Sequence, residues 1–455
     1  MTITIALLVP WVSALGLLAL DGRKRWVGRL AIAALAASLV AIAVLAISVW
    51  DGGTRQIVTG NWPEGVGIVL RADALGVVFA LLTLGVLLAA LAHEVAVGVA
   101  SPRFPALVLF MATGLTGLFL TGDIFNFYVF FEIAMISAYA LTGYGDEPRQ
   151  IGAAFIFAVV NLLGSFLFLI AVAAIYHVTG TLQMEAVAER LSGVEPSTAI
   201  LIAVTVFVAF GVKLGFFPFH FWLPIAYLGA RPSVAAILSG ALANIGTYGI
   251  LRVGAELLPR ELALGASTLL VLGAVTIVYG AVQALSRRNA GEVIAYSSIG
   301  QIGYVLIAVA LGGPVGYAAA VLYGLINALN KTLLFLTTGL RGWFVSGAFV
   351  IGCLSVAGVP PAAGFFGKLQ VFHAAIAEGS PALVALIFLG GTLSFVYLFQ
   401  IYQHDHWRPA DGVQAASSRS ARAATFVLAG VVLALGLWPE PLLYVSEAAA
   451  GVLGG

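Results

Sequence analysis

Three lysine residues lie where a charged side chain is costly. Lys213, Lys331 and Lys368 each fall inside a long apolar segment, although the chain contains only four lysines and its polar segments use arginine almost exclusively. A charged residue at the centre of a bilayer costs roughly 2.5–3.5 kcal/mol on insertion scales. Buried lysine loses its proton readily, whereas arginine stays charged. Lysine at these positions therefore indicates groups that gain and lose protons in a dry environment.

Glu132 is the one acidic residue that is clearly deep in an apolar segment. It follows Asp123 by nine residues, and this is about 13 Å of helix rise, so Glu132 is expected near mid-membrane if that helix begins at Asp123. A buried carboxylate and a buried lysine can both stay charged when they are paired, and Lys213 is the natural partner. The structural alternative is a static ion pair that only fixes helix packing. Packing alone does not require one such Glu and three such Lys on four helices.

Two apolar segments are interrupted by proline and glycine next to a lysine. The first reads GVKLGFFPFHFWLP and the second reads AGVPPAAGFFGKLQ. Broken helices at corresponding positions of two halves indicate the ion path of a transporter, because the break frees backbone carbonyls at membrane depth. Lys213 and Lys368 are 155 residues apart, which suits two five-helix repeats. His220 and His373 lie near the interruptions, and each is either a proton carrier or a hydrogen-bonded core histidine.

The composition shows what kind of protein must position these residues. Hydrophobic residues make up 61% of the 455 residues and charged residues only 9%, with a mean hydropathy of +1.07. Soluble domains are about half apolar and a quarter charged, so an ordinary globular enzyme is excluded, and so is a disordered chain. The net charge of +1 gives no indication of nucleic-acid binding, and the single cysteine, Cys353, excludes an internal disulfide. The sequence predicts an all-α, polytopic membrane protein.

Apolar runs of about 20 residues, the length that a bilayer requires of a helix, recur along the whole chain. We expect fourteen of them, near 3–20, 28–49, 74–92, 104–121, 124–143, 151–176, 197–224, 232–251, 263–285, 293–311, 315–340, 343–377, 382–402 and 423–445. The longest polar stretches between them are about 50–73, 177–196 and 403–422. The last contains His404, Asp405 and His406, which we interpret as part of a solvated loop rather than a metal site, because no third or fourth ligand is near.

Basic residues indicate the orientation of the chain. With fourteen spans, thirteen lie in loops on one side: Arg23, Lys24, Arg25, Arg29, Arg103, Arg149, Arg231, Arg287, Arg288, Arg341, Arg408, Arg419 and Arg422. Five lie in loops on the other side: Arg55, Arg71, Arg190, Arg252 and Arg260. Because loops rich in Lys and Arg stay cytoplasmic, we expect a multi-pass protein of the inner (plasma) membrane with both termini outside. The first apolar segment has no basic residue ahead of it and is too long for a cleavable signal peptide.

Five motifs, in order, resemble the antiporter-like membrane subunits shared by Mrp-type cation/proton antiporters, respiratory complex I and energy-converting hydrogenases. They are TGDIFNFYVFFEI (121–133), KLGFFPFHFWLP (213–224), IAYSSIGQIGY (294–304), LNKTLLFL (329–336) and GVPPAAGFFGKL (358–369). The stretch GNWPEGVGIVLRAD (60–73) is most similar to the D-type subunit of the Mrp Na⁺/H⁺ antiporter branch. The resemblance covers nearly the whole chain.

The resemblance implies fourteen helices with two inverted five-helix repeats, formed by spans 4–8 and 9–13, and with spans 7 and 12 broken. The corresponding regions are 1–103 (spans 1–3), 104–254 (first repeat), 255–403 (second repeat) and 404–455 (cytoplasmic loop and span 14). It also implies roles in proton translocation for Glu132, Lys213, Lys331 and Lys368. The auxiliary relay candidates are His220, Asn244, Asn327 and His373.

The sequence departs from the family pattern in three places. The family usually has a lysine in span 8, whereas this chain reads ALANIG, with Asn244 at that place. Ile225 and Tyr227 stand where an acid and a histidine often follow WLP, and the connection between spans 11 and 12 is nearly absent. Asparagine can hydrogen-bond to water but cannot hold a proton. The central proton route is therefore either bridged by water at Asn244 or altered.

These features together predict an ion-translocating subunit of a multisubunit membrane complex, with Na⁺/H⁺ antiport as the first interpretation. Such a subunit is not an enzyme, needs no cofactor or metal, and has other integral membrane subunits, H⁺, Na⁺ and lipid as its partners. The alternatives are a proton-pumping subunit of a complex I-like or hydrogenase-type redox complex, a family member that drives inorganic carbon uptake, and a scaffold subunit that has lost transport. Neighbouring genes would distinguish the first two.

Overall fold

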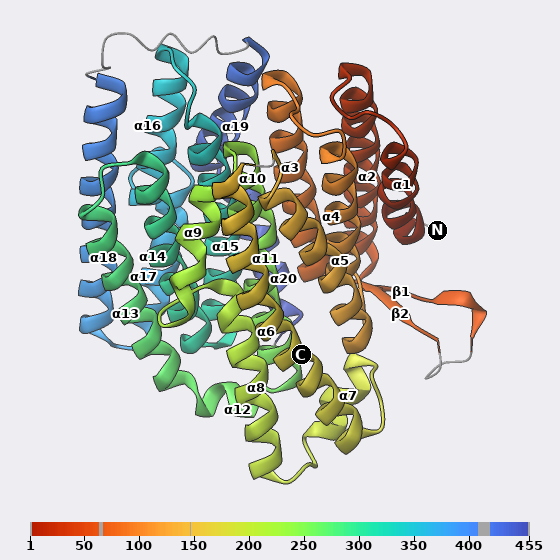
Figure 1. Ribbon diagram of the computed structural model, residues 1–455. Helices are drawn as coiled ribbons and strands as arrows, with labels where there is room; N and C mark the ends of the chain where they lie inside the picture. The colour runs from red at the N-terminus through yellow and green to blue at the C-terminus, as the bar shows by residue number, and fades with distance from the viewer. Residues whose placement is uncertain (1, 63–66, 146, 408–418, 454–455) are drawn as a thin grey trace.

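The computed structural model describes residues 2–62, 67–145, 147–407 and 419–453. Long helices run roughly parallel to one another, and one β-hairpin projects from the bundle near one end (Figure 1). That end also carries two short helices, α7 (Met184–Leu191) and α12 (Pro259–Leu264), and we call it the hairpin face. The opposite end is called the far face.

The helices of the first half of the chain begin and end close to the expected apolar segments. They are α1 (Thr2–Leu18), α2 (Arg25–Gly52), α3 (Ala74–Val97), α4 (Phe104–Phe119), α5 (Ile124–Thr142), α6 (Pro148–Thr179), α7 (Met184–Leu191), α8 (Pro196–Leu214), η2 (Phe219–Phe221), α9 (Trp222–Gly229), α10 (Pro232–Ile237), η3 (Leu238–Leu242), α11 (Asn244–Gly249) and η4 (Ile250–Leu257).

The second half continues with the same kind of packing. Its helices are α12 (Pro259–Leu264), α13 (Ala266–Leu285), α14 (Ala290–Leu311), α15 (Gly313–Thr337), α16 (Trp343–Ala357), α17 (Gly364–Ala377), α18 (Pro381–Tyr402), η5 (Gln403–Trp407), α19 (Arg419–Leu437) and α20 (Glu440–Gly451). Among the described residues, eleven helical segments are long and apolar enough to cross a membrane, and α1, α4 and α16 are shorter apolar helices. The expected all-α membrane architecture is confirmed at this level.

Both predicted interruptions are present. Helix α8 ends at Leu214, and the chain resumes helical structure in η2 and α9; Gly215, which caps α8, has φ +68°. Helix α16 ends at Ala357, and α17 begins at Gly364; Gly358, which caps α16, has φ +79°. Glycine adopts this left-handed conformation without the steric penalty of a Cβ atom, so it ends each half-helix inside the bundle.

The expected loop 50–73 instead contains an antiparallel hairpin, β1 (Arg55–Val58) and β2 (Val69–Ala72), with Arg55 opposite Ala72. Strand β2 is also hydrogen-bonded to the turn between α4 and α5, because the Arg71 amide donates to the Leu120 carbonyl at 2.8 Å. The expected loop 177–196 contains α7, an amphipathic helix. The third polar stretch, 403–422, begins as a continuation of α18 (η5) and ends in the first turn of α19; residues 408–418 lie outside the described residues.

One predicted boundary was wrong in a way that matters for the site. The eighth apolar segment was expected to end at 251 and to leave Arg252 in a loop. The helical span instead runs continuously from Pro232 to Leu257, and Arg252 is 2% exposed inside it. We call Pro232–Leu257 the α10–η4 span. Arg71, also assigned to a loop, lies in β2 and is buried. Both arginines are held inside the protein by carboxylates, and Asp73, which both of them contact, lies far from Arg252 in the sequence.

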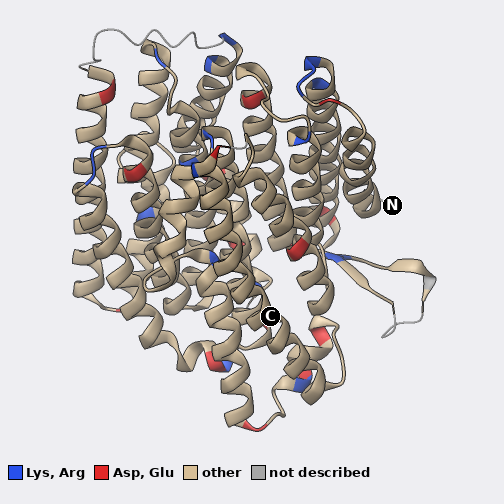
Figure 2. Cartoon of the chain, viewed as in Figure 1, with Lys and Arg blue, Asp and Glu red and all other residues tan. Residues whose placement is uncertain are grey.

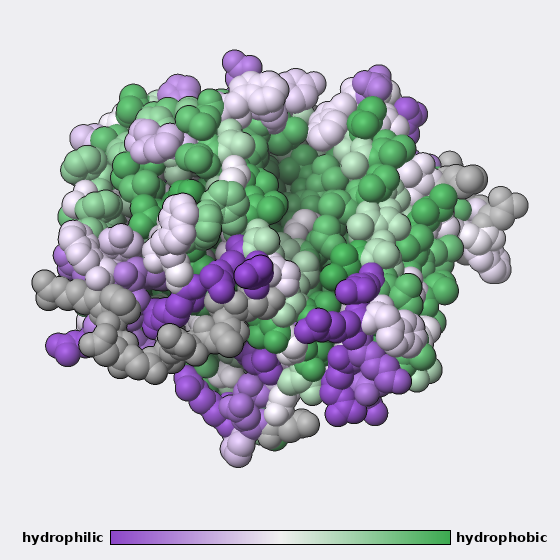
Figure 3. All heavy atoms as spheres, turned by 90° about the horizontal axis from the view of Figure 1, so that it is seen from above, coloured by the Kyte–Doolittle hydropathy of each residue, from purple (hydrophilic) through white to green (hydrophobic). Residues whose placement is uncertain are grey.

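The outer surface is suited to lipid. Large apolar side chains on α6 and α18 are exposed, including Phe155 and Phe388, each 68% exposed. Seen from the far face, hydrophilic residues run across the centre and lower half of the view, and hydrophobic residues lie above and beside them (Figure 3). Lys and Arg gather at the far face, while a few blue segments lie deep in the bundle (Figure 2).

Candidate functional site

Lys213 lies in the last turn of α8, directly before the first break, and is 7% exposed. Its Nζ donates to the backbone carbonyl of Asn161 at 3.1 Å and to the Ser165 hydroxyl at 3.3 Å, both on α6. The same ammonium lies 4.2 Å from the centre of the Phe131 ring. The lysine therefore contacts a carbonyl, a hydroxyl and an aromatic ring, and no carboxylate of the described residues is within 4.0 Å of it.

Glu132 lies on α5, which begins after the Asp123 N-cap as expected. The expected pairing of Glu132 with Lys213 is not a direct contact, because no ion pair between them within 4.0 Å occurs among the described residues. Glu132 is nevertheless near enough for its charge to act on the Lys213 ammonium. Successive helix residues point about 100° apart, and it is the neighbouring Phe131 that faces Lys213. One carboxylate oxygen of Glu132, Oε1, is buried without a hydrogen-bond partner.

A cavity of about 10 Å³ adjoins Lys213 and is lined by Asn161, Trp222 and Tyr227 among others. This volume is room for about one water molecule. Trp222 closes one side, because its Nε1 donates to the Val212 carbonyl at 2.9 Å across the break. The break in the helix thus positions both Lys213 and the small cavity beside it.

The α10–η4 span packs between the surroundings of Lys213 and those of Lys331. A Cβ atom added to Gly246 would collide with Leu214, next to Lys213, and one added to Gly240 would collide with the Thr332 hydroxyl, next to Lys331. Asn244 lies between these two glycines and is 3% exposed; its Nδ2 donates to the Gly240 carbonyl at 2.8 Å. That carbonyl lies in η3, a π-helical turn whose hydrogen bonding differs from that of an α-helix. Asn244 therefore supports the distorted helix at the level of the lysines.

Replacing Asn244 with lysine, the residue usual in the family, is expected to lower transport by about tenfold or more, since a second buried cation without a carboxylate adds well over 1.4 kcal/mol to a barrier. The measurement is ion exchange in membrane vesicles at equal protein abundance. Asn244→Gln, which keeps the amide, is the matched control and should retain more activity. Higher activity in Asn244→Lys would contradict this and would indicate the decay of an ancestral relay.

Lys331 on α15 is completely buried and begins a chain of hydrogen-bonded side chains. Its Nζ donates to the Ser297 hydroxyl at 2.6 Å, and the Tyr397 hydroxyl donates to the same oxygen at 2.9 Å. Gln301 donates from Nε2 to the Ser394 hydroxyl at 3.3 Å, and Ser394 Oγ lies 3.1 Å from the Tyr397 hydroxyl oxygen. Helices α14, α15 and α18 each contribute to this chain.

The chain ends near Lys368, on α17 after the second break. The Tyr323 hydroxyl donates to Gln301 Oε1, and the Tyr323 ring stacks on the Tyr304 ring with centroids 5.1 Å apart. Lys368 Nζ lies 5.0 Å from the centre of the Tyr304 ring and donates to the Ala357 carbonyl, the last residue of α16, at 3.1 Å. The break thus supplies the carbonyl that accepts from Lys368. The predicted proximity of lysine to each break is confirmed.

A second cavity of about 10 Å³ lies beside this chain and is lined by Gln301, Tyr323, Asn327, Asn330 and Ser355 among others. The carbonyl oxygens Oδ1 of Asn327 and Asn330 are buried and have no hydrogen-bond partner in the protein. Unpaired buried acceptors are costly and call for a donor such as water. Asn327 therefore lines this cavity, and its role as an auxiliary relay residue stays a prediction.

The two histidines have different surroundings. His220 in η2 packs against Tyr279 with ring centroids 4.4 Å apart, and its Nδ1 is buried without a partner. His373 on α17 is exposed. The structure therefore keeps His220 near the first break but does not bring His373 to the side-chain network around Lys331 and Lys368.

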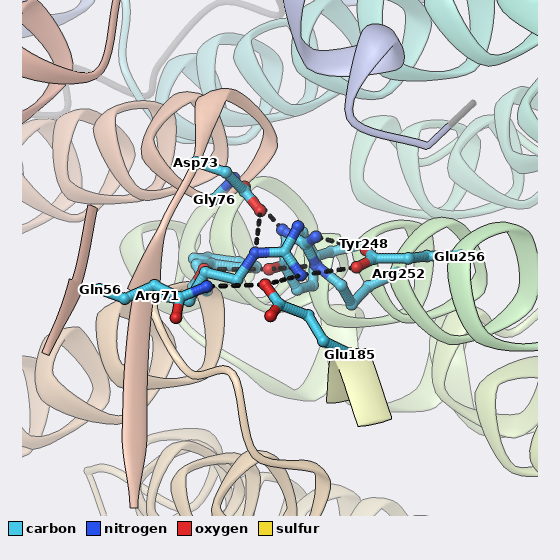
Figure 4. A network of polar contacts seen from close by, with 9 residues as sticks. Gln56, Arg71, Asp73, Gly76, Glu185, Tyr248, Arg252 and Glu256 are labelled. Carbon is cyan, nitrogen blue, oxygen red and sulfur yellow. Dashed lines mark hydrogen bonds and ion pairs between the residues drawn. The ribbon is translucent and has the colours of Figure 1, made fainter. Parts of the chain in front are cut away.

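Sequence reasoning missed a cluster of charges at the hairpin face (Figure 4). Arg252 donates from Nη2 to Asp73 at 2.7 Å and from Nη1 to Glu256 at 2.5 Å. Arg71 pairs with Asp73 at 3.0 Å and with Glu256 at 2.6 Å. Burial would raise the pKa of the Asp73 carboxyl, but the two arginines outweigh it and hold the pKa below its usual range. The four-residue spacing of Arg252 and Glu256 was the available signal, because such pairs meet on one helix face.

A second buried ion pair lies at the far face. Arg231, directly before α10, pairs through Nε with Glu94 at 3.2 Å, and Glu94 is 2% exposed. Tyr144 donates to Glu94 at 2.7 Å, and the Ser233 hydroxyl also donates to it. Because Asp73 and Glu94 lie at opposite ends of α3, this helix holds the α10–η4 span by an arginine at each end.

The chain is similar to known proteins both in sequence and in fold. The family described as "NADH:quinone oxidoreductase/Mrp antiporter, TM" matches residues 121–343 and 343–394. A Bacillus subtilis protein, named as the D-type subunit of an Na⁺/H⁺ antiporter, is 30% identical over 483 residues, covering 99% of this chain and 97% of the relative. A protein of the same name from Alkalihalophilus pseudofirmus is 30% identical over 388 residues, covering 80% of this chain and 78% of the relative.

Solved structures extend this likeness to the whole fold. A chain of the Mrp complex from Dietzia sp. is 28% identical with a TM-score of 0.90, covering 99% of this chain and 97% of the other. A chain of the archaeal membrane-bound sulfane sulfur reductase is 26% identical with a TM-score of 0.90, with the same coverage. The family match over more than half of the sequence, together with these relatives along nearly all of it, establishes that the chain belongs to the NADH:quinone oxidoreductase/Mrp antiporter family of membrane subunits.

Proposed function

We propose that this chain is a proton- and cation-translocating subunit of a multisubunit Na⁺/H⁺ antiporter in the plasma membrane, and that it is a transporter subunit rather than an enzyme. The observation that carries the proposal is the line of side chains from Lys331 to Tyr323, which joins the surroundings of two buried lysines. Apolar side chains would serve packing better than buried charges and unpaired acceptors on this scale, so these polar groups indicate a function other than packing. The names of the relatives favour Na⁺ as the exchanged cation.

The proposed mechanism is an electrostatic relay. A proton or cation that arrives near Glu132 changes the field at Lys213, which holds its charge through neutral hydrogen-bond acceptors and an aromatic ring. The change is passed across the α10–η4 span to Lys331, and from there along Ser297, Tyr397 and Gln301 toward Lys368. Each transfer is a shift in proton affinity caused by a neighbouring charge in a site of low dielectric constant.

The finer fold that we propose has fourteen spans and two inverted repeats, 104–254 and 255–403, flanked by 1–103 and 404–455. The directions of the broken helices support it. The first broken helix runs from the hairpin face toward the far face, whereas the second runs from the far face toward the hairpin face (Figure 1). The gathering of Lys and Arg at the far face supports a cytoplasmic far face and both termini outside.

A proton pump in a redox complex is the second candidate, because structures of such complexes contain chains of the same fold. One chain of Thermus thermophilus complex I is 25% identical with a TM-score of 0.86, covering 100% of both chains. This likeness supports a common translocation fold, while the names of the relatives favour antiport. In either case the partners are other membrane subunits.

The test uses everted membrane vesicles from an antiporter-deficient host that expresses the chain with the subunits encoded beside it. Respiration acidifies the vesicle interior, and a pH-sensitive dye records the gradient. Addition of NaCl should dissipate the gradient, whereas choline chloride should not. The proposal is wrong if Na⁺, Li⁺ and K⁺ all leave the gradient intact while a redox donor specific to the complex generates one.

A further inference from the structure

A line of polar side chains follows one face of the α10–η4 span. Its members recur every fourth residue: Asn244, Tyr248, Arg252 and Glu256. Residues four apart lie on the same helix face, and twelve residues correspond to about 18 Å of rise. Arg252 joins its neighbours, because it donates to Tyr248 Oη at 3.0 Å and to Glu256 at 2.5 Å. The line connects the hairpin face with the level at which Asn244 lies between the two halves of the site.

At the hairpin end of this line, the charged side chains become less exposed from the surface toward the protein interior. The exposed fractions of the charged side chains there fall in the order Glu185 51%, Glu256 14%, Arg71 10%, Arg252 2% and Asp73 0%. Figure 4 shows these groups converging from the hairpin, α7, the start of α3 and η4. The cluster therefore extends from the surface of the hairpin face inward, with Arg252 and Asp73 as its innermost members.

Beyond Arg252 the line passes through aromatic rings. Tyr248 is completely buried, with ring centroids 5.5 Å from Phe79, 4.9 Å from Phe119 and 6.2 Å from Phe127. Its hydroxyl donates to the Phe119 carbonyl at 2.9 Å. Hydrophobic constrictions exclude water and resist ions, so the hydroxyl of Tyr248 is the polar group through which this constriction is crossed.

We propose that this line is the ion access route from the hairpin face to the centre of the protein, and that Arg252, bound to Asp73 and Glu256, blocks it. The proposal rests on the function proposed above and adds the route and its gate. Arginine stays charged under all physiological conditions, so Arg252 does not pass a proton onward, and its ion pairs with the two carboxylates hold it across the route. Asp73 holds Arg252 firmly, because its Oδ1 also accepts from the Gly76 amide at 2.9 Å. Glu256 is more exposed to solvent than Asp73, so the ion pair between Arg252 and Glu256 is the one that breaks first when the gate opens.

The hairpin takes part in this gate. Arg71 on β2 binds Glu256, while Gln56 on β1 donates to Glu185 of α7 at 2.6 Å. A displacement of the hairpin therefore changes the partner that competes with Arg252 for Glu256. The closed gate is the state in which Arg71 and Arg252 share Glu256.

The test measures proton leak without exchange. Vesicles that contain the whole complex in Na⁺-free medium receive an imposed pH gradient, with K⁺ and valinomycin clamping the membrane potential. Wild type should hold the gradient, and Arg252→Gln should dissipate it about tenfold faster, equivalent to about 1.4 kcal/mol at the barrier. Tyr248→Phe keeps the aromatic ring and should stay leak-tight while its exchange rate falls by about tenfold.

Two controls separate a gate from damage to the fold. Arg231→Gln removes the other arginine that ties this span to α3 and should stay leak-tight. The double variant Asp73→Asn with Arg252→Gln removes the barrier without leaving a buried carboxylate unpaired, and its leak should persist. A leak that disappears in the double variant, or Arg252→Gln vesicles that are as tight as wild type, would overturn the proposal. Lys213→Ala should lose exchange without leaking, so failure of the relay and failure of the gate are distinguishable.

Discussion

Vesicles that carry Lys213→Ala are expected to show no Na⁺-dependent proton movement, although the complex still assembles. Lys213 is the only ammonium among the described residues of α8 and lies directly before the first break. Alanine removes the charge from a site whose acceptors, the Asn161 backbone carbonyl and the Ser165 hydroxyl, are neutral, and the Ser165 hydroxyl can rotate to donate to that carbonyl or to water. The loss is therefore one of charge transfer rather than of a salt bridge that holds helices together. The measurement is the dissipation of a respiratory pH gradient on addition of NaCl.

Glu132→Ala is expected to give the same loss, because the relay needs a group that changes charge near Lys213. Its Oε1 has no hydrogen-bond partner among the described residues, so removal of this oxygen leaves no buried donor there unsatisfied. Glu132→Gln keeps the volume and removes only the charge, and should also be inactive. Lys24→Ala is the matched control, since this lysine lies outside the apolar segments and should retain full transport. Normal exchange by Glu132→Ala vesicles would refute the relay.

The distance between Glu132 and Lys213 refines what the pair can do. Direct contact would stabilise the charged forms of both groups strongly, and such an ion pair would resist the proton transfers that the relay requires. In the structure Phe131 lies against the lysine, and the carboxylate acts through space. Coulomb coupling falls only as the inverse of distance in a medium of low dielectric constant, so the two charges still influence each other. The separation of Glu132 from Lys213 therefore favours a pair whose protonation can change over a static ion pair that only holds helices together.

The sequence predicted the breaks and the lysines because both depend on strong local rules. Glycine and proline end helices wherever they occur, as at Gly215 and Gly358. Lysine inside an apolar run is recognisable without any structure, and so is the start of α5 at Asp123. Even the loss of the connection between spans 11 and 12 was predictable from spacing, since α15 ends at Thr337 and α16 begins at Trp343.

The polar chain and the gate were not predictable, for a physical reason. Serine, tyrosine and glutamine occur in membrane helices without a strong penalty, so Ser297 and Tyr397 give no signal on their own. Their hydrogen bond joins residues that are 100 positions apart, and no local pattern encodes that contact. Arg252 was misplaced because the helix continues past the apolar segment; the carboxylate of Asp73, 179 residues away, makes its burial possible.

Lys331→Ala is expected to abolish exchange as completely as Lys213→Ala. Lys331 is completely buried, and its hydrogen bond to Ser297 is the first link of the chain toward Lys368. Alanine removes the proton carrier and leaves the Ser297 hydroxyl bonded to Tyr397, which keeps the local packing satisfied. The protein should therefore accumulate normally while transport, measured as the response of the pH gradient to NaCl, is lost.

Tyr397→Phe tests whether the chain itself carries the proton. The substitution keeps the ring and removes one hydroxyl that contacts both Ser297 and Ser394, at 2.9 Å and 3.1 Å. Loss of one positioned proton-transfer group typically lowers a rate about 10²-fold or more, so exchange should fall strongly while the gradient remains stable without Na⁺. Tyr444→Phe is the matched control, because Tyr444 is 62% exposed on α20. If Tyr397→Phe exchanges like wild type while Lys331→Ala does not, the proton passes from Lys331 by another path, and the unpaired oxygens of Asn327 and Asn330 mark where that path runs.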